Sequence, residues 1–81
     1  MARVSISSDG RGFTGGLAEL EVEAANVRGL ILALDARFPG FGDYVQRRMA
    51  IAIDGEIHQN AWVEALRPDA EVFLIPKIGG G

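Results

Sequence analysis

Residues 18–38 read AELEVEAANVRGLILALDARF, and the spacing of the apolar residues changes within this stretch. In its first part, apolar side chains alternate with Glu19, Glu21 and Glu23, which is the period of a strand with one buried face. A slip of one residue would bury the three carboxylates, so the register is well defined. Further on, apolar residues recur at the spacing of one helical face: Val27, Leu30, Ile31, Leu34 and Phe38. A strand followed by a helix is therefore predicted.

The residues on either side of this stretch extend the prediction. Asn26 is a suitable N-cap, because its side chain can accept a hydrogen bond from a free N–H of the first helical turn. Pro39-Gly40 is expected to end the helix. Towards the N-terminus, Val4 and Ile6 alternate with polar residues and predict a first strand. A glycine-rich loop over residues 10–16 would join the two strands as an antiparallel hairpin.

The second half of the chain contains further strands and one ambiguous segment. Residues 41–48 have no clear period and allow a short helical turn, whereas residues 49–53 are apolar on both faces and predict a third strand. Asp54-Gly55 is typical of a tight turn, and a short strand over 56–58 would return from it. Residues 59–65 are irregular, with Trp62 and the following Leu66 as expected core anchors.

Residues 71–75 predict the last strand, and this strand is apolar on both faces. Val72 and Leu74 lie on one face, Phe73 and Ile75 on the other. One helix can cover only one face of a four- or five-stranded sheet, so we expect a two-layer α+β domain. The apolar set on the other face would be either a partner surface or the underside of the 59–65 loop with Trp62.

The composition excludes several classes of protein. A chain of 81 residues is one domain with a small core. It has no cysteine and one histidine, His58, so thiolate or multi-histidine metal sites and cysteine nucleophiles are excluded, and no metal site is expected. A net charge of −3 argues against nucleic acid as a partner. No apolar run approaches the ~20 residues of a membrane span, and no signal-peptide core is present, so we expect a cytoplasmic protein and no membrane partner.

The C-terminal segment suggests a chemistry. After Pro76, Lys77 and Ile78 come three glycines, 79–81, and an extended Ile78–Gly81 would reach roughly 13 Å. Such a tail is thin enough to deliver its carboxylate to a buried site on another protein. There, attack on the α-phosphate of ATP would give an acyl-adenylate from which sulfide or an amine displaces AMP. The alternative is a frayed end with no role.

The run over residues 69–81, DAEVFLIPKIGGG, resembles the C-terminus of the molybdopterin synthase small subunit and thiamine sulfur-carrier family (MoaD/ThiS). Residues 27–38 match the single long helix of that family, and residues 49–55 match its central strand and turn. The resemblance implies a ubiquitin-like β-grasp fold with a mixed sheet and one main helix on one face. It implies a domain over residues 1–76 and a flexible C-terminal glycine tail over 77–81.

The resemblance also implies a function. Gly81, preceded by Gly80, would be adenylylated by an E1-like adenylyltransferase that uses ATP, and then converted to a thiocarboxylate; the chain itself would bind no cofactor and would not be an enzyme. Sulfur would come from a donor such as a cysteine desulfurase or rhodanese-type protein and pass to an acceptor such as the molybdopterin synthase large subunit, of which this chain could be the small subunit. Partner-binding residues are implied on the open face and at the base of the tail: Ile57, Phe73, Ile75, Pro76, Lys77 and Ile78.

Several alternatives stay open at this stage. The loop at Phe13-Thr14-Gly15-Gly16 resembles carriers that deliver sulfur outside molybdopterin synthesis, so the pathway is undecided. A protein modifier would use the same adenylate but form an isopeptide bond through Gly81. An interaction domain would use the open sheet face alone. The sequence also leaves open whether Gly81 is the encoded end or the product of processing.

Overall fold

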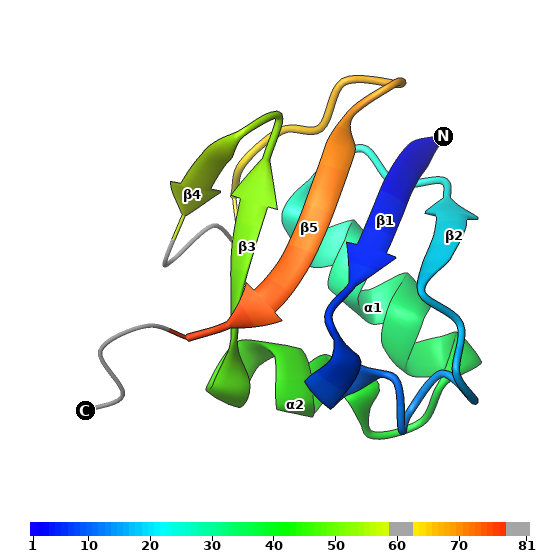
Figure 1. Cartoon of the computed structure of the whole chain (residues 1–81). Helices are drawn as coiled ribbons and strands as arrows, with labels where there is room; N and C mark the ends of the chain where they lie inside the picture. The colour runs from blue at the N-terminus through cyan, green and yellow to red at the C-terminus, as the bar shows by residue number, and fades with distance from the viewer. Residues whose placement is uncertain (59–62, 78–81) are drawn as a thin grey trace.

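The computed structural model describes residues 1–58 and 63–77 of the chain (Figure 1). In chain order the elements are β1 (Ala2–Ile6), the 3-10 helix η1 (Ser8–Gly10), β2 (Glu19–Val22), α1 (Val27–Arg37), α2 (Phe41–Arg48), β3 (Met49–Ile53), β4 (Glu56–His58) and β5 (Glu71–Pro76). These strands form one mixed sheet in the order β2-β1-β5-β3-β4. β1 and β5 pair in parallel, and the other neighbours pair antiparallel.

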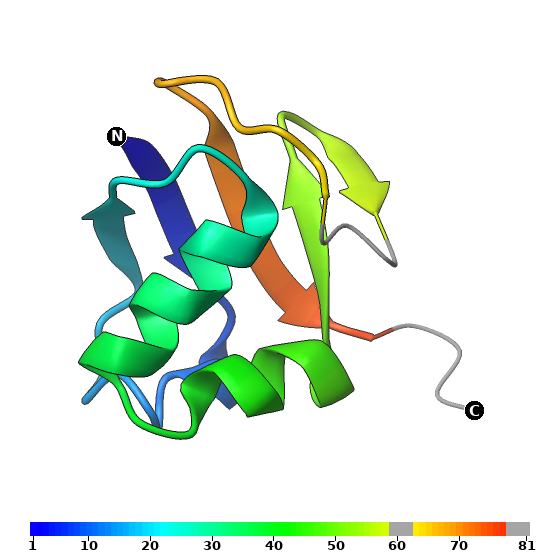
Figure 2. The ribbon, with the colours of Figure 1, turned by 180° about the vertical axis from the view of Figure 1, so that it is seen from behind.

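Both helices lie on the same side of the sheet. α1 runs diagonally across the strands, and α2 lies across one end of the same layer (Figure 2). The other face of the sheet is turned to the viewer in Figure 1, and no helix of residues 1–58 and 63–77 lies over it. The predicted two-layer α+β arrangement is therefore confirmed.

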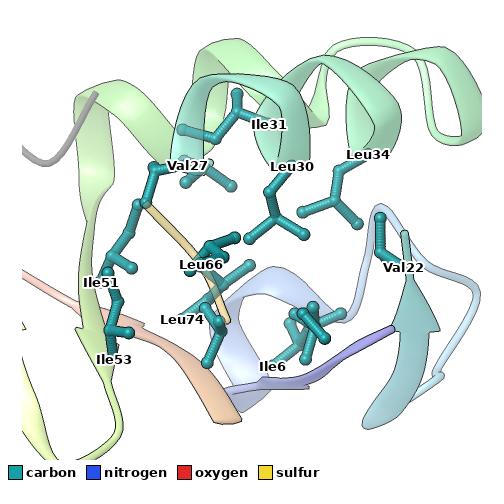
Figure 3. Packing of buried hydrophobic residues seen from close by; sticks show 14 of the residues in the cluster. Ile6, Val22, Val27, Leu30, Ile31, Leu34, Ile51, Ile53, Leu66 and Leu74 are labelled. Carbon is teal, nitrogen blue, oxygen red and sulfur yellow. The ribbon is translucent and has the colours of Figure 1, made fainter. Parts of the chain in front are cut away.

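The hydrophobic core fills the space between the sheet and the helices. The predicted helical face of α1 supplies Val27, Leu30, Ile31 and Leu34, all of them buried (Figure 3). They pack against the alternate residues of the strands, among them Ile6, Ile51 and Leu74. Ala50 and Ala52 of β3 are also buried, but they do not belong to this cluster, because they lie on the other face of the sheet.

Local predictions in the first half of the chain are confirmed. β1 and β2 form an antiparallel hairpin in which Ala2 pairs with Val22, and Glu19 and Glu21 are exposed on the alternate positions. The Asn26 side chain accepts a hydrogen bond from the Gly29 N–H at 2.8 Å, as expected of the N-cap of α1. β2 is shorter than the alternation suggested, since it ends at Val22.

Two local predictions after residue 49 are also confirmed. Asp54 and Gly55 both have positive φ, 49° and 89°, which is the conformation of a tight hairpin turn between β3 and β4. Leu66 is buried, and its N–H donates to the Ala25 carbonyl oxygen at 2.9 Å, beside the start of α1. The expected anchor Trp62 lies outside the described residues.

The ambiguous segment after α1 forms a full second helix, α2, rather than a short turn. Its N-cap is Gly40, which has a φ of 92° and no side chain to cap the helix. Asp35 of α1 takes over this task, because its Oδ1 atom accepts hydrogen bonds from the N–H groups of Gly40 at 3.1 Å and Gly42 at 3.0 Å. A carboxylate at this position also complements the helix dipole.

We expect Asp35→Ala to destabilise the domain by about 1–2 kcal/mol, the usual cost of losing a helix N-cap. Two N–H groups at the start of α2 would lose their acceptor. Urea unfolding followed by circular dichroism measures the change. Asp35→Asn is the control, because it keeps the acceptor oxygen and should lose less than half as much. Equal stability of Asp35→Ala and the wild type would contradict this role of Asp35.

In the part of the chain that the structure describes, neither helix is long and apolar enough to cross a membrane.

Candidate functional site

The open face of the sheet carries one contiguous apolar surface. Cross-strand pairing places Phe73 of β5 beside Ala52 of β3, and Ala52 beside Ile57 of β4. One step along the sheet, Ile75 pairs with Ala50. These five residues form what we call the apolar face. Ala52 lies between Phe73 and Ile57, and Ala50 lies beside Ile75, so the β3 positions of the apolar face carry the small side chains.

The large side chains of the apolar face remain in contact with solvent. Phe73 is 41% exposed and Ile57 is 54% exposed, whereas Ala52 is 8% exposed. The neighbouring core residues Val72 and Leu74 are completely buried on the other side of the same strand. An apolar surface of this kind on a small acidic domain is typical of a partner-binding site. The predicted candidates Phe73, Ile75 and Ile57 are thus on one face, although their role as partner contacts stays a prediction.

The apolar face leads directly to the base of the tail. β5 carries Phe73 and Ile75 and ends at Pro76. The next residue, Lys77, donates its N–H to the carbonyl oxygen of Arg48, the last residue of α2, at 3.2 Å. Pro76 and Lys77 are both exposed. A partner that covers the apolar face would therefore also lie beside the point where residues 78–81 begin. The predicted site residues Ile78, Gly80 and Gly81 lie outside the described residues.

Charged residues border the apolar face. On the β2 and β1 side, Arg3 is paired across the strands with both Glu21 and Glu71. On β4 the charged groups lie on the other face: His58 pairs with the core residue Ile51 and has Glu56 and Glu64 at 3.9 Å from its two ring nitrogens. Among residues 1–58 and 63–77, no group of three or more histidine, aspartate or glutamate side chains is placed to hold a metal ion. This face can therefore bind a partner through apolar contacts and through charged side chains at its border.

One structural feature was missed by the sequence reasoning. The loop after β1 is not an open glycine loop, since the Phe13 ring stacks on Phe41 at 5.3 Å and contacts the Tyr44 ring at 5.0 Å between centroids. The Thr14 hydroxyl donates to the Leu17 carbonyl oxygen at 2.9 Å and holds the loop in place. An aromatic residue between glycines was the only signal of this docking in the sequence. The loop leads into a strand, not a helix, so it lacks the helix N-terminus of a phosphate-binding loop.

Solved structures with the same architecture identify the fold. A chain of the Amycolatopsis orientalis BexX/CysO complex matches with a TM-score of 0.86 at 20% identity, covering 100% of both chains. The antigen CysO of Mycobacterium tuberculosis matches with a TM-score of 0.86 at 19% identity, covering 96% of this chain and 100% of that one. The small archaeal modifier protein 1 (SAMP1) of Methanosarcina acetivorans matches with a TM-score of 0.79 at 21% identity, covering 99% and 95%. The fold is thus the ubiquitin-like β-grasp that the sequence resemblance implied.

The family follows from the sequence itself. The ThiS family matches residues 10–81, which is most of the chain and includes its last glycines. The chain therefore belongs to the ThiS family of ubiquitin-like sulfur-carrier proteins, as the C-terminal resemblance indicated. A sequence comparison with curated proteins gave no significant match.

Proposed function

We propose that this chain carries sulfur as a thiocarboxylate on Gly81. The observation that carries the proposal is the ThiS-family match, which covers residues 10–81 and so includes Gly81. In the first step, the Gly81 carboxylate attacks the α-phosphate of ATP in the site of an E1-like adenylyltransferase, and pyrophosphate leaves. In the second step, a sulfide equivalent attacks the acyl carbon, and AMP leaves with the oxygen that joined it to the carbonyl. The product is a glycine thiocarboxylate.

The apolar face is the surface that we expect the activating enzyme to cover. Phe73, Ile75 and Ile57 would lose water on docking. Full burial of an exposed large apolar side chain contributes about 1.5–3 kcal/mol, and each of these three would contribute a part of that, because it is already partly buried. The route from this face through Pro76, Lys77 and Ile78 to Gly81 is a single continuous stretch of chain. The A. orientalis chain of the same fold was crystallised in a complex with BexX, so a protein of this fold does bind a partner.

The chain itself supplies the carried group and the docking surface, while the adenylylation is catalysed by the partner. A cysteine desulfurase or rhodanese-type protein would supply the sulfur in the cytoplasm. The acceptor would be a biosynthetic enzyme for a cofactor or an amino acid. If that acceptor is a molybdopterin synthase large subunit, this chain acts as the small subunit of the synthase.

Intact-mass spectrometry tests the proposal. The chain is incubated with the activating enzyme, ATP and sulfide, and we expect a mass gain equal to the replacement of one oxygen by one sulfur. Fragmentation should map that gain to Gly81, and omission of ATP is the control. No gain with an enzyme shown to be active on another carrier would contradict the proposal. Higher-mass conjugates on a denaturing gel, lost when Gly81 is removed, would instead indicate a protein modifier.

A further inference from the structure

Two cations lie opposite each other at the base of the tail. Arg48 is the last residue of α2, and Lys77 directly follows β5. The Lys77 N–H donates to the Arg48 carbonyl oxygen at 3.2 Å, which extends by one step the register that pairs Met49 with Pro76. Both Arg48 and Lys77 are exposed. We call these two residues the cationic corner.

The cationic corner is not neutralised by the domain. Arg47, the neighbour of Arg48, is paired with Asp43 at 3.2 Å, and Arg67 is paired with Asp54 at 3.5 Å. Over residues 1–58 and 63–77, no carboxylate lies within ion-pair distance of Arg48 or Lys77. Like charges at opposite positions of neighbouring strands destabilise a sheet. Residues that break such a local rule are often kept for function.

The two ends of β3 and β5 also differ in their charged residues. At the far end of these two strands, Glu71 and Asp54 are joined, because the Asp54 N–H donates to the Glu71 carbonyl oxygen at 2.9 Å and the Glu71 N–H donates to Asp54 Oδ1 at 3.0 Å. At that far end the carboxylates have cations beside them, since Arg67 is 3.5 Å from Asp54 and Arg3 lies opposite Glu71, so among the described residues at the ends of these two strands the unpaired cations lie at the end that carries the tail. The apolar face lies between the two ends.

We propose that the cationic corner recognises an acidic rim at the entrance of the activating enzyme's site and so orients the carrier on that enzyme. This inference rests on the proposed function. Lys77 is four residues from Gly81, and four extended residues span about 13 Å. At that distance Lys77 contacts the protein surface around the entrance rather than the phosphates of ATP. Complementary charges of this kind act mainly on the rate of association and on orientation.

The test is the kinetics of loading by the activating enzyme with Lys77→Glu. This substitution removes one cation and gives Arg48 a partner, so it neutralises the whole corner. We expect the KM for the carrier to rise about tenfold, the lower end of the range for electrostatic steering. The kcat and the KM for ATP should not change. For the wild type, kcat/KM should fall as salt is added, and this dependence should be weaker in the variant.

Two control variants distinguish the effect of the position of the substitution from the effect of the change in net charge. Arg28→Glu makes the same change in net charge at an exposed site on α1, and its KM should equal that of the wild type. Lys77→Arg keeps the cation and should also load normally. A second readout does not depend on the enzyme: Lys77→Glu should raise the urea midpoint of the free domain, because it replaces a like-charge pair with an opposite one.

Each possible result of these measurements either supports or overturns the inference. A raised KM for Lys77→Glu with a higher urea midpoint supports the inference, since a purely structural role would move activity and stability in the same direction. An unchanged KM for the carrier overturns the inference while the wild type still loads. A changed kcat or KM for ATP overturns it as well, because the corner would then act at the nucleotide. If the wild type itself fails to load, the proposed function is wrong and the inference falls with it.

Discussion

Deletion of Gly81 is expected to reduce loading at least about 100-fold, because a displacement of about 1 Å at a reacting centre already costs this much. Removal of one residue moves the terminal carboxylate back by about 3.5 Å in an extended chain. Addition of one alanine after Gly81 should have the same effect, since it moves the carboxylate forward by a similar distance. Intact-mass spectrometry over a time course measures the loss of thiocarboxylate formation.

The control for this experiment is Gly79→Ala, which keeps the length of the tail. It should load within a few-fold of the wild type, because the carboxylate stays at the same distance from the domain. Each of these variants leaves the described core residues unchanged, so we expect urea unfolding to be the same for all of them. Normal loading of the shortened or the extended chain would show that the terminal carboxylate is not the loaded group.

The elements that were predicted correctly are those with local signals. The change of period at Asn26, the N-cap itself and the Asp54-Gly55 turn all depend on residues within a few positions of each other. The assignment of the β5 side chains to the two faces of the sheet was also predictable, since alternation alone separates Phe73 and Ile75 from Val72 and Leu74. These local signals were sufficient for the fold class and for the residues of β5 that lie on the open face.

The features that were missed depend on contacts between distant residues. The start of α2 is capped by Asp35, which belongs to the preceding helix, so residues 41–48 alone show no cap. The loop at Phe13 is held by Phe41, which is far along the chain. In the same way, the position of Arg48 opposite Lys77 follows from the pairing of β3 with β5. No periodicity in a single segment contains this information.

The two parts of the proposed site were predictable to different degrees. The tail carries a sequence motif, so Gly80 and Gly81 were recognised from the sequence, and their role stays a prediction. The apolar face is assembled from three strands, and the sequence identified its members without their arrangement. The register that brings Phe73, Ala52 and Ile57 into one row is a result of the sheet order, in which β3 lies between β5 and β4.

The second large effect is expected for Phe73→Asp, which places a carboxylate in the row that joins Phe73, Ala52 and Ile57. A charge there would have to be buried when a partner covers the apolar face, so we expect binding to the activating enzyme to weaken by more than 2 kcal/mol, about 30-fold in Kd. Isothermal titration calorimetry with the enzyme measures this change.

The matched control for Phe73→Asp is Leu32→Asp, which makes a comparable change at a side chain that is 58% exposed on α1, in the helical layer. It should leave the Kd unchanged. Phe73 is outside the core, so the folded domain should tolerate its substitution with a loss of about 1 kcal/mol or less, the range of strand propensities. Wild-type affinity of Phe73→Asp would exclude the apolar face as the docking surface. If instead Phe73→Asp abolishes binding of a partner and deletion of Gly81 changes nothing, the chain is an interaction domain and the tail has no part in its function.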